Sequence, residues 1–342
     1  MNPLVSLLLL TYNQESIVET AVMSAFEQNY SPLEIILSDD CSTDGTFDAL
    51  QKMADEYDGP HKVRVNRNVS NLGIGKHWDT ISRQAMGDLI IHAAGDDISV
   101  PSRVTVLLKA WKSVEPQPSM ISSDGMIMTF DEGKPVRRHI GSRWPEEVLI
   151  QRKPREYDLD SLDVPVSGFS LAIDRRLYEV FEPIQDRLWA EDVMLRRRAL
   201  LLQGIMYIPD VLVFYRDQGL SKGAKKNQQA YLELYIAQAE TRLSMVYQSM
   251  RDIDTVSPLE AHAYLRKLQC QEKSAKRRLR LIHGDLLTSA VMLFCQIAGK
   301  REFGINRKEY LSLFIVKWAP KFFFWARNMK IKVMKMSKFA VR

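Results

Sequence analysis

The first hundred residues alternate short apolar runs with segments whose apolar residues recur at helical spacing. The apolar runs predict buried strands over 5–10, 33–37, 63–66 and 89–93. Helical spacing predicts helices over 16–28, 43–57 and 75–86, with residues 42–44 available as an N-terminal cap for the second. Because strands and helices alternate with short links, we predict an α/β fold whose mostly parallel central sheet is covered by helices on both faces.

The pattern changes after residue 101. It predicts a helix over 102–114, a longer strand over 120–130, a turn at 131–133, a strand over 169–173, a helix from 174 and a helix over 191–202. Two short strands are expected near 205–208 and 211–215. The stretch 137–165 is polar and without a clear period, which favours a long functional or mobile loop.

Beyond residue 217 the strand patterns stop and two long helical patterns follow, over 228–250 and 258–297. We therefore predict a catalytic α/β domain over 1–217 and an α-helical C-terminal region over 218–342. Neither an internal repeat nor a low-complexity segment interrupts this division.

The composition is ordinary for a globular protein: 342 residues, 46% hydrophobic and 26% charged. No apolar run approaches the roughly 20 residues of a membrane-spanning helix, and no cationic segment precedes the first run, so neither a secretory signal nor a transmembrane helix is predicted. The cysteines are odd in number and widely spaced, which favours a reducing cytoplasm and argues against a structural zinc site.

The formal net charge of +5 is concentrated at one end of the chain. Residues 317–342 hold eight Lys or Arg and no acid, which leaves 39 basic against 42 acidic residues in 1–316, a net of −3. This distribution does not predict nucleic-acid binding. Written as a helix, residues 321–338 place Phe322, Trp325 and Met329 on one side and lysines on the other, so we expect a basic amphipathic helix on an anionic membrane surface. The alternative is that its apolar stripe packs on the catalytic domain, or on a second subunit of a homo-oligomer.

Acidic pairs follow two of the predicted strands, at Asp39-Asp40 and Asp96-Asp97, and a third pair, Glu191-Asp192, begins a predicted helix. Ligands of an open parallel sheet bind beyond the carboxyl ends of its strands, so the two pairs at strand ends are expected to converge on one edge. An isolated Asp pair in a loop is commonly a helix cap or turn former. Several carboxylates on one edge repel each other unless a cation neutralises them, which favours a divalent-cation site.

Two other phosphate-binding arrangements are excluded by the glycine spacing. Gly73-Ile74-Gly75 is followed by Trp78 where a dinucleotide fingerprint needs its third glycine, and no GxxxxGK[ST] P-loop occurs. A cation held by carboxylates can bridge a diphosphate instead.

Four segments, in order, resemble the sequence blocks of family 2 glycosyltransferases. They are VSLLLLTYNQESIVETAVMSAFEQNYSPLEIILSDDCSTDGT, NLGIGKHWDTISRQAMGDLIIHAAGDDISVPSRV, SGFSLAIDRRLYE and WAEDVMLRRRALLL. The resemblance covers roughly residues 3–217. It implies a GT-A fold, a nucleotide-diphosphate-sugar donor, with a UDP-sugar favoured, and inversion at the anomeric carbon.

The resemblance also implies roles for individual residues. Asp192 would be the general base, and Asp97 would bind Mg²⁺ or Mn²⁺ with Asp96 facing the ribose or the metal. The remaining positions would bind substrate: Thr11, Tyr12, Glu15, Asp39, Asp40, Gly168 and Glu191. Gly95 stands where the family's motif has its first acidic residue, which leaves the number of protein ligands at the metal open.

We therefore predict an inverting, metal-dependent glycosyltransferase that extends a lipid-linked glycan at the cytoplasmic face of the membrane, in surface-polysaccharide biosynthesis. The absence of a QxxRW motif argues against a processive polymer synthase. A sugar nucleotidyltransferase is one alternative, although the glycine- and basic-rich opening loop of that class is missing. A non-catalytic glycan-binding scaffold of the same fold is the other, and the intact Asp39, Asp97 and Asp192 argue against it.

Overall fold

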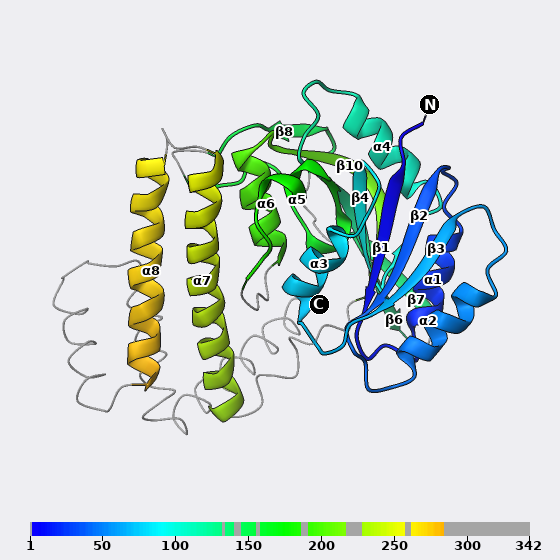
Figure 1. Ribbon diagram of the computed structural model, residues 1–342, viewed down its shortest axis with the longest axis horizontal. Coiled ribbons are helices and arrows are strands. Elements are labelled where there is room, and N and C mark those ends of the chain that lie inside the picture. Colours follow the sequence, from blue (N-terminus) through cyan, green and yellow to red (C-terminus); the bar gives the residue numbers. More distant parts are fainter. Residues whose placement is uncertain are drawn as a thin grey trace, which may run out of the picture. The chain divides into compact units, whose positions relative to one another are not determined.

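The computed structural model describes residues 2–131, 134–139, 145–154, 158–185, 191–216, 228–256 and 261–283 (Figure 1). The chain divides into two compact units, one of Met1–Gln218 with Gln248–Tyr264 and the other of Gly219–Tyr247 with Leu265–Arg342. The first unit takes in a later stretch of the chain, so its extent differs from that of the domain proposed over 1–217.

The first unit is built on one sheet, which has ten strands among the described residues. Its main path has the order β3-β2-β1-β4-β9-β6-β10-β5, while β7 pairs with β6 and β8 pairs with β10. The strands are β1 (Val5–Thr11), β2 (Leu33–Asp39), β3 (Lys62–Arg67), β4 (Leu89–Ala94), β5 (Ile98–Ser99), β6 (Met120–Asp131), β7 (Lys134–His139), β8 (Leu149–Gln151), β9 (Leu171–Asp174) and β10 (Ile205–Arg216).

Six strands, β1–β4, β6 and β10, run in one direction, and the other four run against them. The short β9 lies antiparallel between β4 and β6. The prediction of an α/β fold with a mostly parallel sheet is confirmed, although the antiparallel place of β9 was not foreseen.

Helices cover both faces of the sheet, as Figure 1 shows. On one face the core joins side chains such as Leu7 and Ile35 to α1 (Val18–Phe26), α2 (Thr46–Asp55) and α4 (Arg103–Lys112). On the other, Leu8 and Ile36 pack with α3 (Ile74–Ser82), α5 (Arg176–Val180) and α6 (Glu191–Leu201). Alternate residues of one strand serve opposite cores, which is why the central strands read as continuous apolar runs.

Two predictions about the later strands were wrong in detail. The segments near 205–208 and 211–215 form one strand, β10, whose register shifts between Ile208 and Val213. Pro209 lies in this stretch and has no N–H to donate to the ladder, so the pattern looks broken although the strand continues. The stretch 137–165 is not one structureless loop, because it includes the last residues of β7 and all of β8.

The helical patterns after residue 217 correspond to α7 (Gln228–Val256) and α8 (Ala261–His283). The predicted basic amphipathic helix over 321–338 lies outside the described residues. Among the residues that are described, no helix is long and apolar enough to span a bilayer.

Candidate active site

The carboxyl ends of β1, β2 and β4 lie at one edge of the sheet. Thr11 is opposite Asp39 in the β1–β2 ladder, and Leu10 is opposite Ala94 in the β1–β4 ladder. The segments after these strands therefore meet, as the sequence predicted, and they carry Asp39-Asp40 and Asp96-Asp97.

Asp39 is completely buried at the end of β2. Its carboxylate accepts a hydrogen bond from the backbone N–H of Ser42 at 2.8 Å and one from Thr11 Oγ1 at 3.4 Å. Arg67 Nε lies 3.7 Å from Asp39 Oδ2. Thr11 and Asp39 are thus in contact, and the Arg67 guanidinium lies beside them.

Asp40 is directed away from Asp39 and holds the loop that leads into α3. Its carboxylate accepts hydrogen bonds from Asn68 Nδ2 at 2.8 Å and from the backbone N–H groups of Leu72 and Gly73, each at 2.9 Å. Both of its oxygens are therefore bound to protein donors. Asp40 thus holds this loop in shape, and its contact with substrate stays a prediction.

The loops after β1 and β2 are bonded to each other. Glu15 Oε2 accepts the backbone N–H of Gly45 at 3.0 Å, and Asn13 Oδ1 accepts that of Thr43 at 2.9 Å. Asn13 has a left-handed backbone, with φ of 51°. Glu15 thus joins the two loops, and Tyr12, in the same loop as Glu15, is 45% exposed.

The second acidic pair contains a buried oxygen without a partner. Asp97 Oδ1 accepts the backbone N–H of Arg216 at 3.0 Å, a contact set up by the pairing of β5 with β10. Asp97 Oδ2 is buried and has no hydrogen-bond partner within the described structure. Burial, with the neighbouring Asp96 charge, raises the pKa of Asp97 to about 7, and burial also raises the pKa of Asp96.

This arrangement fits a divalent cation that is coordinated by one or two side chains of the protein and otherwise by water and substrate phosphates. No cluster of three or more Asp, Glu, His or Cys side chains able to hold a metal occurs among the described residues. Mg²⁺ commonly takes only one or two carboxylates and completes its shell with water and substrate phosphates. Asp97 Oδ2 and the Asp96 carboxylate provide that number, and a cation would remove the penalty of the buried charge.

The third acidic pair opens α6. Glu191 is only 7% exposed, and its Oε2 is buried without a partner in the part of the chain that the structure describes. Burial, with the charge of Asp192 next to it, raises the pKa of Glu191 to about 8. Asp192 is half-buried, and its Oδ1 accepts the backbone N–H of Val193 at 2.8 Å.

The short 3₁₀ helix η1 (Gly168–Ser170) links the second and third acidic pairs. A Cβ built on Gly168 would lie 3.6 Å from Asp192 Cβ and 3.7 Å from Glu191 Oε1. The carbonyl of the next residue, Phe169, accepts a hydrogen bond from Arg103 Nη2 at 3.1 Å. The charge of Arg103 in turn partly opposes the rise that burial causes in the pKa of Asp97.

Sequence reasoning missed Arg103, which is completely buried at the start of α4. Its guanidinium also donates to the carbonyl of His92 at 2.7 Å and to Ser99 Oγ at 2.9 Å. Burial lowers its pKa to about 10. The available signal was its helical spacing with Leu107 and Trp111, which puts Arg103 on the inward face of the helix.

His77 on α3 is buried, with Nε2 2.6 Å from Ser38 Oγ. Burial lowers its pKa to about 4, so the imidazole is neutral at physiological pH. Through this contact with Ser38, His77 joins α3 to the end of β2.

The profile of glycosyl transferase family 2 matches residues 6–180. A protein named as a glycosyltransferase, EpsE of Bacillus subtilis, is 32% identical over 102 residues, which are 30% of this chain and 36% of EpsE. The GalNAc(5)-diNAcBac-PP-undecaprenol beta-1,3-glucosyltransferase of Campylobacter jejuni is 25% identical over 254 residues, or 71% of this chain and 76% of that protein. The chain thus spans only about a third of the length of EpsE.

Solved structures share the fold. S. aureus TarS 1–349 in complex with UDP-GlcNAc has a TM-score of 0.52 at 15% identity, covering 93% of this chain and 91% of that one. The mannosyltransferase PcManGT of Pyrobaculum calidifontis, with GDP-Man and Mn²⁺, has a TM-score of 0.51 at 18% identity, covering 93% and 86%.

Proposed function

Since the chain belongs to glycosyl transferase family 2, we propose that it transfers a sugar from a nucleotide-diphosphate-sugar to a glycan hydroxyl. We further propose that transfer inverts the anomeric carbon and requires Mg²⁺ or Mn²⁺. One observation carries the proposal: within the described residues, Asp97 Oδ2 and Glu191 Oε2 are both buried without a hydrogen-bond partner. Gly168 lies beside Glu191, and the next residue, Phe169, is bonded to Arg103, whose charge acts on Asp97.

The donor would bind at the edge formed by β1, β2 and β4. Tyr12 would contact the base with its exposed ring, Asp39 would accept hydrogen bonds from the base, and Thr11 and Glu15 would form the wall. The complexes of TarS with UDP-GlcNAc and of PcManGT with GDP-Man support a nucleotide-sugar, and we favour a UDP-sugar.

The acidic residues would divide the chemistry between them. Asp97, with Asp96, would hold the cation, which stabilises the negative charge of the departing diphosphate. Asp192 would take the proton of the acceptor hydroxyl. The hydroxyl oxygen would form a bond to the anomeric carbon while the bond from that carbon to the diphosphate breaks. Gly168 and Glu191 would form the wall beside the acceptor. An attack from the face opposite the leaving group inverts the anomeric centre.

The acceptor we propose is a lipid-linked glycan of surface-polysaccharide biosynthesis. Support comes from the name of the Campylobacter relative, whose acceptor carries undecaprenol, and from the basic, apolar pattern of residues 321–338. The proposed location is the cytoplasmic face of the membrane, with the chain peripherally bound there.

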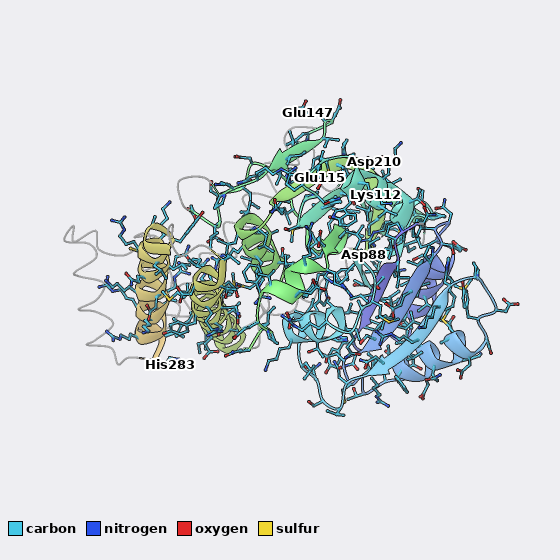
Figure 2. All side chains as sticks on the ribbon, turned by 45° about the horizontal axis from the view of Figure 1, so that its top comes forward. Asp88, Lys112, Glu115, Glu147, Asp210 and His283 are labelled. Carbon is cyan, nitrogen blue, oxygen red and sulfur yellow. The ribbon has the colours of Figure 1, made fainter. Side chains whose placement is uncertain are left out.

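The test is release of nucleoside diphosphate from UDP-GlcNAc and GDP-mannose, with and without Mn²⁺. We expect Asp97→Asn to abolish turnover and to remove the stabilisation of the protein by Mn²⁺ with UDP. Asp192→Asn should still bind UDP and Mn²⁺ but lose at least ~100-fold in turnover. Asp88→Asn is the matched control, because Asp88 is exposed just before β4, at the other end of the strand (Figure 2).

Three results would contradict parts of the proposal. Full activity in the presence of a chelator would rule out the cation. Loss of UDP binding in Asp192→Asn as severe as its loss of turnover would mean that Asp192 is not the base. Formation of nucleotide-sugar and pyrophosphate from a nucleoside triphosphate and a sugar phosphate would identify a nucleotidyltransferase instead, and binding of a nucleotide-sugar without turnover would favour the scaffold.

A further inference from the structure

The helix α8 carries a concentrated positive charge that the proposed chemistry does not use. Its 23 residues contain seven Lys or Arg and one acid, Glu272, a net of +6 with histidine neutral. Residues 1–316 have a net charge of −3, so the rest of that stretch, without α8, carries −9. α8 therefore has a net positive charge within a stretch whose remainder is net negative.

Five exposed basic residues of α8 form a single stripe. At 100° per residue they fall within a sector of roughly 100°, and a further exposed lysine, Lys267, lies outside it. The exposed residues of the stripe are Arg266, Lys273, Lys276, Arg280 and His283. His283 is the last residue of the helix (Figure 2). At about 1.5 Å per residue the stripe is roughly 26 Å long.

The side of α8 opposite the stripe packs against the protein, so the stripe faces outward. Tyr264, Leu268 and Ala275 are buried there. Glu272 accepts hydrogen bonds from Tyr247 on α7 at 3.1 Å and from Lys276 at 2.5 Å, so the one acid of the helix is already bound.

The charge and shape of the stripe favour a flat anionic surface. It is straight, and it has neither an aromatic side chain to stack on a base nor an exposed acid. A planar surface can contact such a straight stripe along its whole length. Anionic membranes attract basic segments in this way, over a distance set by the salt concentration.

We propose that the stripe of Arg266, Lys273, Lys276, Arg280 and His283 docks the protein electrostatically on the headgroups of an anionic phospholipid membrane. This surface is separate from the predicted helix over 321–338, which would insert apolar side chains. The stripe has no large apolar residue to insert, so its binding depends on charge and weakens steeply as salt rises.

The full-length chain is tested by co-sedimentation with vesicles of phosphatidylcholine containing about a quarter phosphatidylglycerol, a typical anionic fraction. The stripe variant is Arg266→Gln, Lys273→Gln and Arg280→Gln. Each cation near such a surface contributes about fivefold to binding, so we expect the partition coefficient to fall about 100-fold. The matched control, Lys52→Gln, Lys109→Gln and Lys112→Gln, removes the same charge from exposed positions on α2 and α4 and should bind as the wild type does.

A second variant separates loss of charge from loss of fold. Arg266→Lys, Lys273→Arg and Arg280→Lys keeps every charge and should retain binding. The proposal is overturned if the stripe variant binds as well as the control, if the charge-retaining variant loses binding too, or if vesicles of pure phosphatidylcholine capture the wild type equally. Tighter capture by duplex DNA than by the anionic vesicles would assign the stripe to nucleic acid. The assay contains no sugar donor, so its outcome is independent of the proposed activity.

Discussion

Glu191 is a carboxylic acid at neutral pH, because its pKa is about 8. The cost of ionising it comes first from burial and then from the neighbouring Asp192. A neutral carboxylic acid can donate a hydrogen bond, whereas a carboxylate can only accept one. Under the proposed mechanism, Glu191 would donate such a bond to the acceptor beside Asp192.

The pKa of Glu191 predicts how the stability of the protein depends on pH. Between its usual value of 4.5 and about 8, native Glu191 retains a proton that the unfolded chain has released. Its contribution to the free energy of unfolding is therefore fully present below about pH 4.5 and is lost as the pH rises towards 8, by the order of a few kcal/mol. Glu191→Gln should flatten this loss in urea denaturation at pH 5 and pH 8, whereas Glu56→Gln, at an exposed site, should not. Equal slopes in both variants would mean that Glu191 is ionised at neutral pH.

Gly168 provides a steric probe of the proposed acceptor site. Because an added Cβ would make ordinary contacts of 3.6–3.9 Å with Glu191 and Asp192, Gly168→Ala should fold with nearly the same melting temperature. It should lower kcat/KM for the acceptor about tenfold and leave the KM of the donor unchanged. Steady-state kinetics with each substrate varied in turn provides the check, and a change in donor KM alone would place Gly168 on the donor side.

The acidic residues of the site could be predicted from sequence, while the basic residues that support them could not. Asp39, Asp97 and Glu191 directly follow or precede recognisable elements, so topology alone brings them to one edge. Arg103 and Arg198 are completely buried, and buried arginines are rare unless they are paired. Phe169 and Asp252, which pair with them, are distant in sequence, so a local pattern can place an arginine on the inward face of a helix but cannot reveal this pairing.

At the scale of elements, α6 is held by its arginines. Arg197 contacts Asp160 at 2.7 Å and Ser249 Oγ at 3.0 Å. Arg198 binds Asp252 through two hydrogen bonds, of 2.8 Å and 3.1 Å, and donates to the carbonyl of Glu182 at 2.8 Å. The last turns of α7 thus fix the helix that begins with Glu191 and Asp192.

Removing one member of this buried pair should be costly. Asp252→Asn preserves the shape of the side chain but leaves the Arg198 charge with only Asp79, whose Oδ1 is 3.5 Å away. We expect the free energy of unfolding to fall by about 3 kcal/mol in urea denaturation. Asp254→Asn, two residues further along at an exposed position, is the control and should change it by less than about 0.5 kcal/mol. Equal effects of the two substitutions would contradict this role for Asp252.

The elements were predictable to different degrees for a physical reason. β1, β2 and β4 are buried on both faces, so hydrophobicity alone marks them. β8 has three residues, of which one is buried, and it exists because β10 offers it an edge. Its stability comes from a partner more than fifty residues away, which a local pattern cannot contain.

At the scale of the whole molecule, the compact first unit includes Gln248–Tyr264. A fragment that ends at residue 217 lacks Ser249 and Asp252, so the buried Arg198 would lose its main counter-charge. Such a fragment should be poorly soluble or melt without cooperativity, whereas a fragment that ends at residue 264 should melt cooperatively. Circular dichroism melting of both fragments tests this, and equal melting temperatures would show that 1–217 is a self-sufficient domain.

The direction of β9 has a consequence for how such an enzyme could diversify. β9 runs against β4 and β6, so its first residue lies towards the edge at which β4 ends, and η1 enters the site just before it. The segment that precedes this short strand therefore lies beside Asp192, while Tyr12 and Asp39 lie in the first third of the chain. Under the proposed mechanism, separate segments of the sequence then determine the specificity for the acceptor and for the donor. Recombination around residues 165–170 would then exchange one specificity and inherit the other intact.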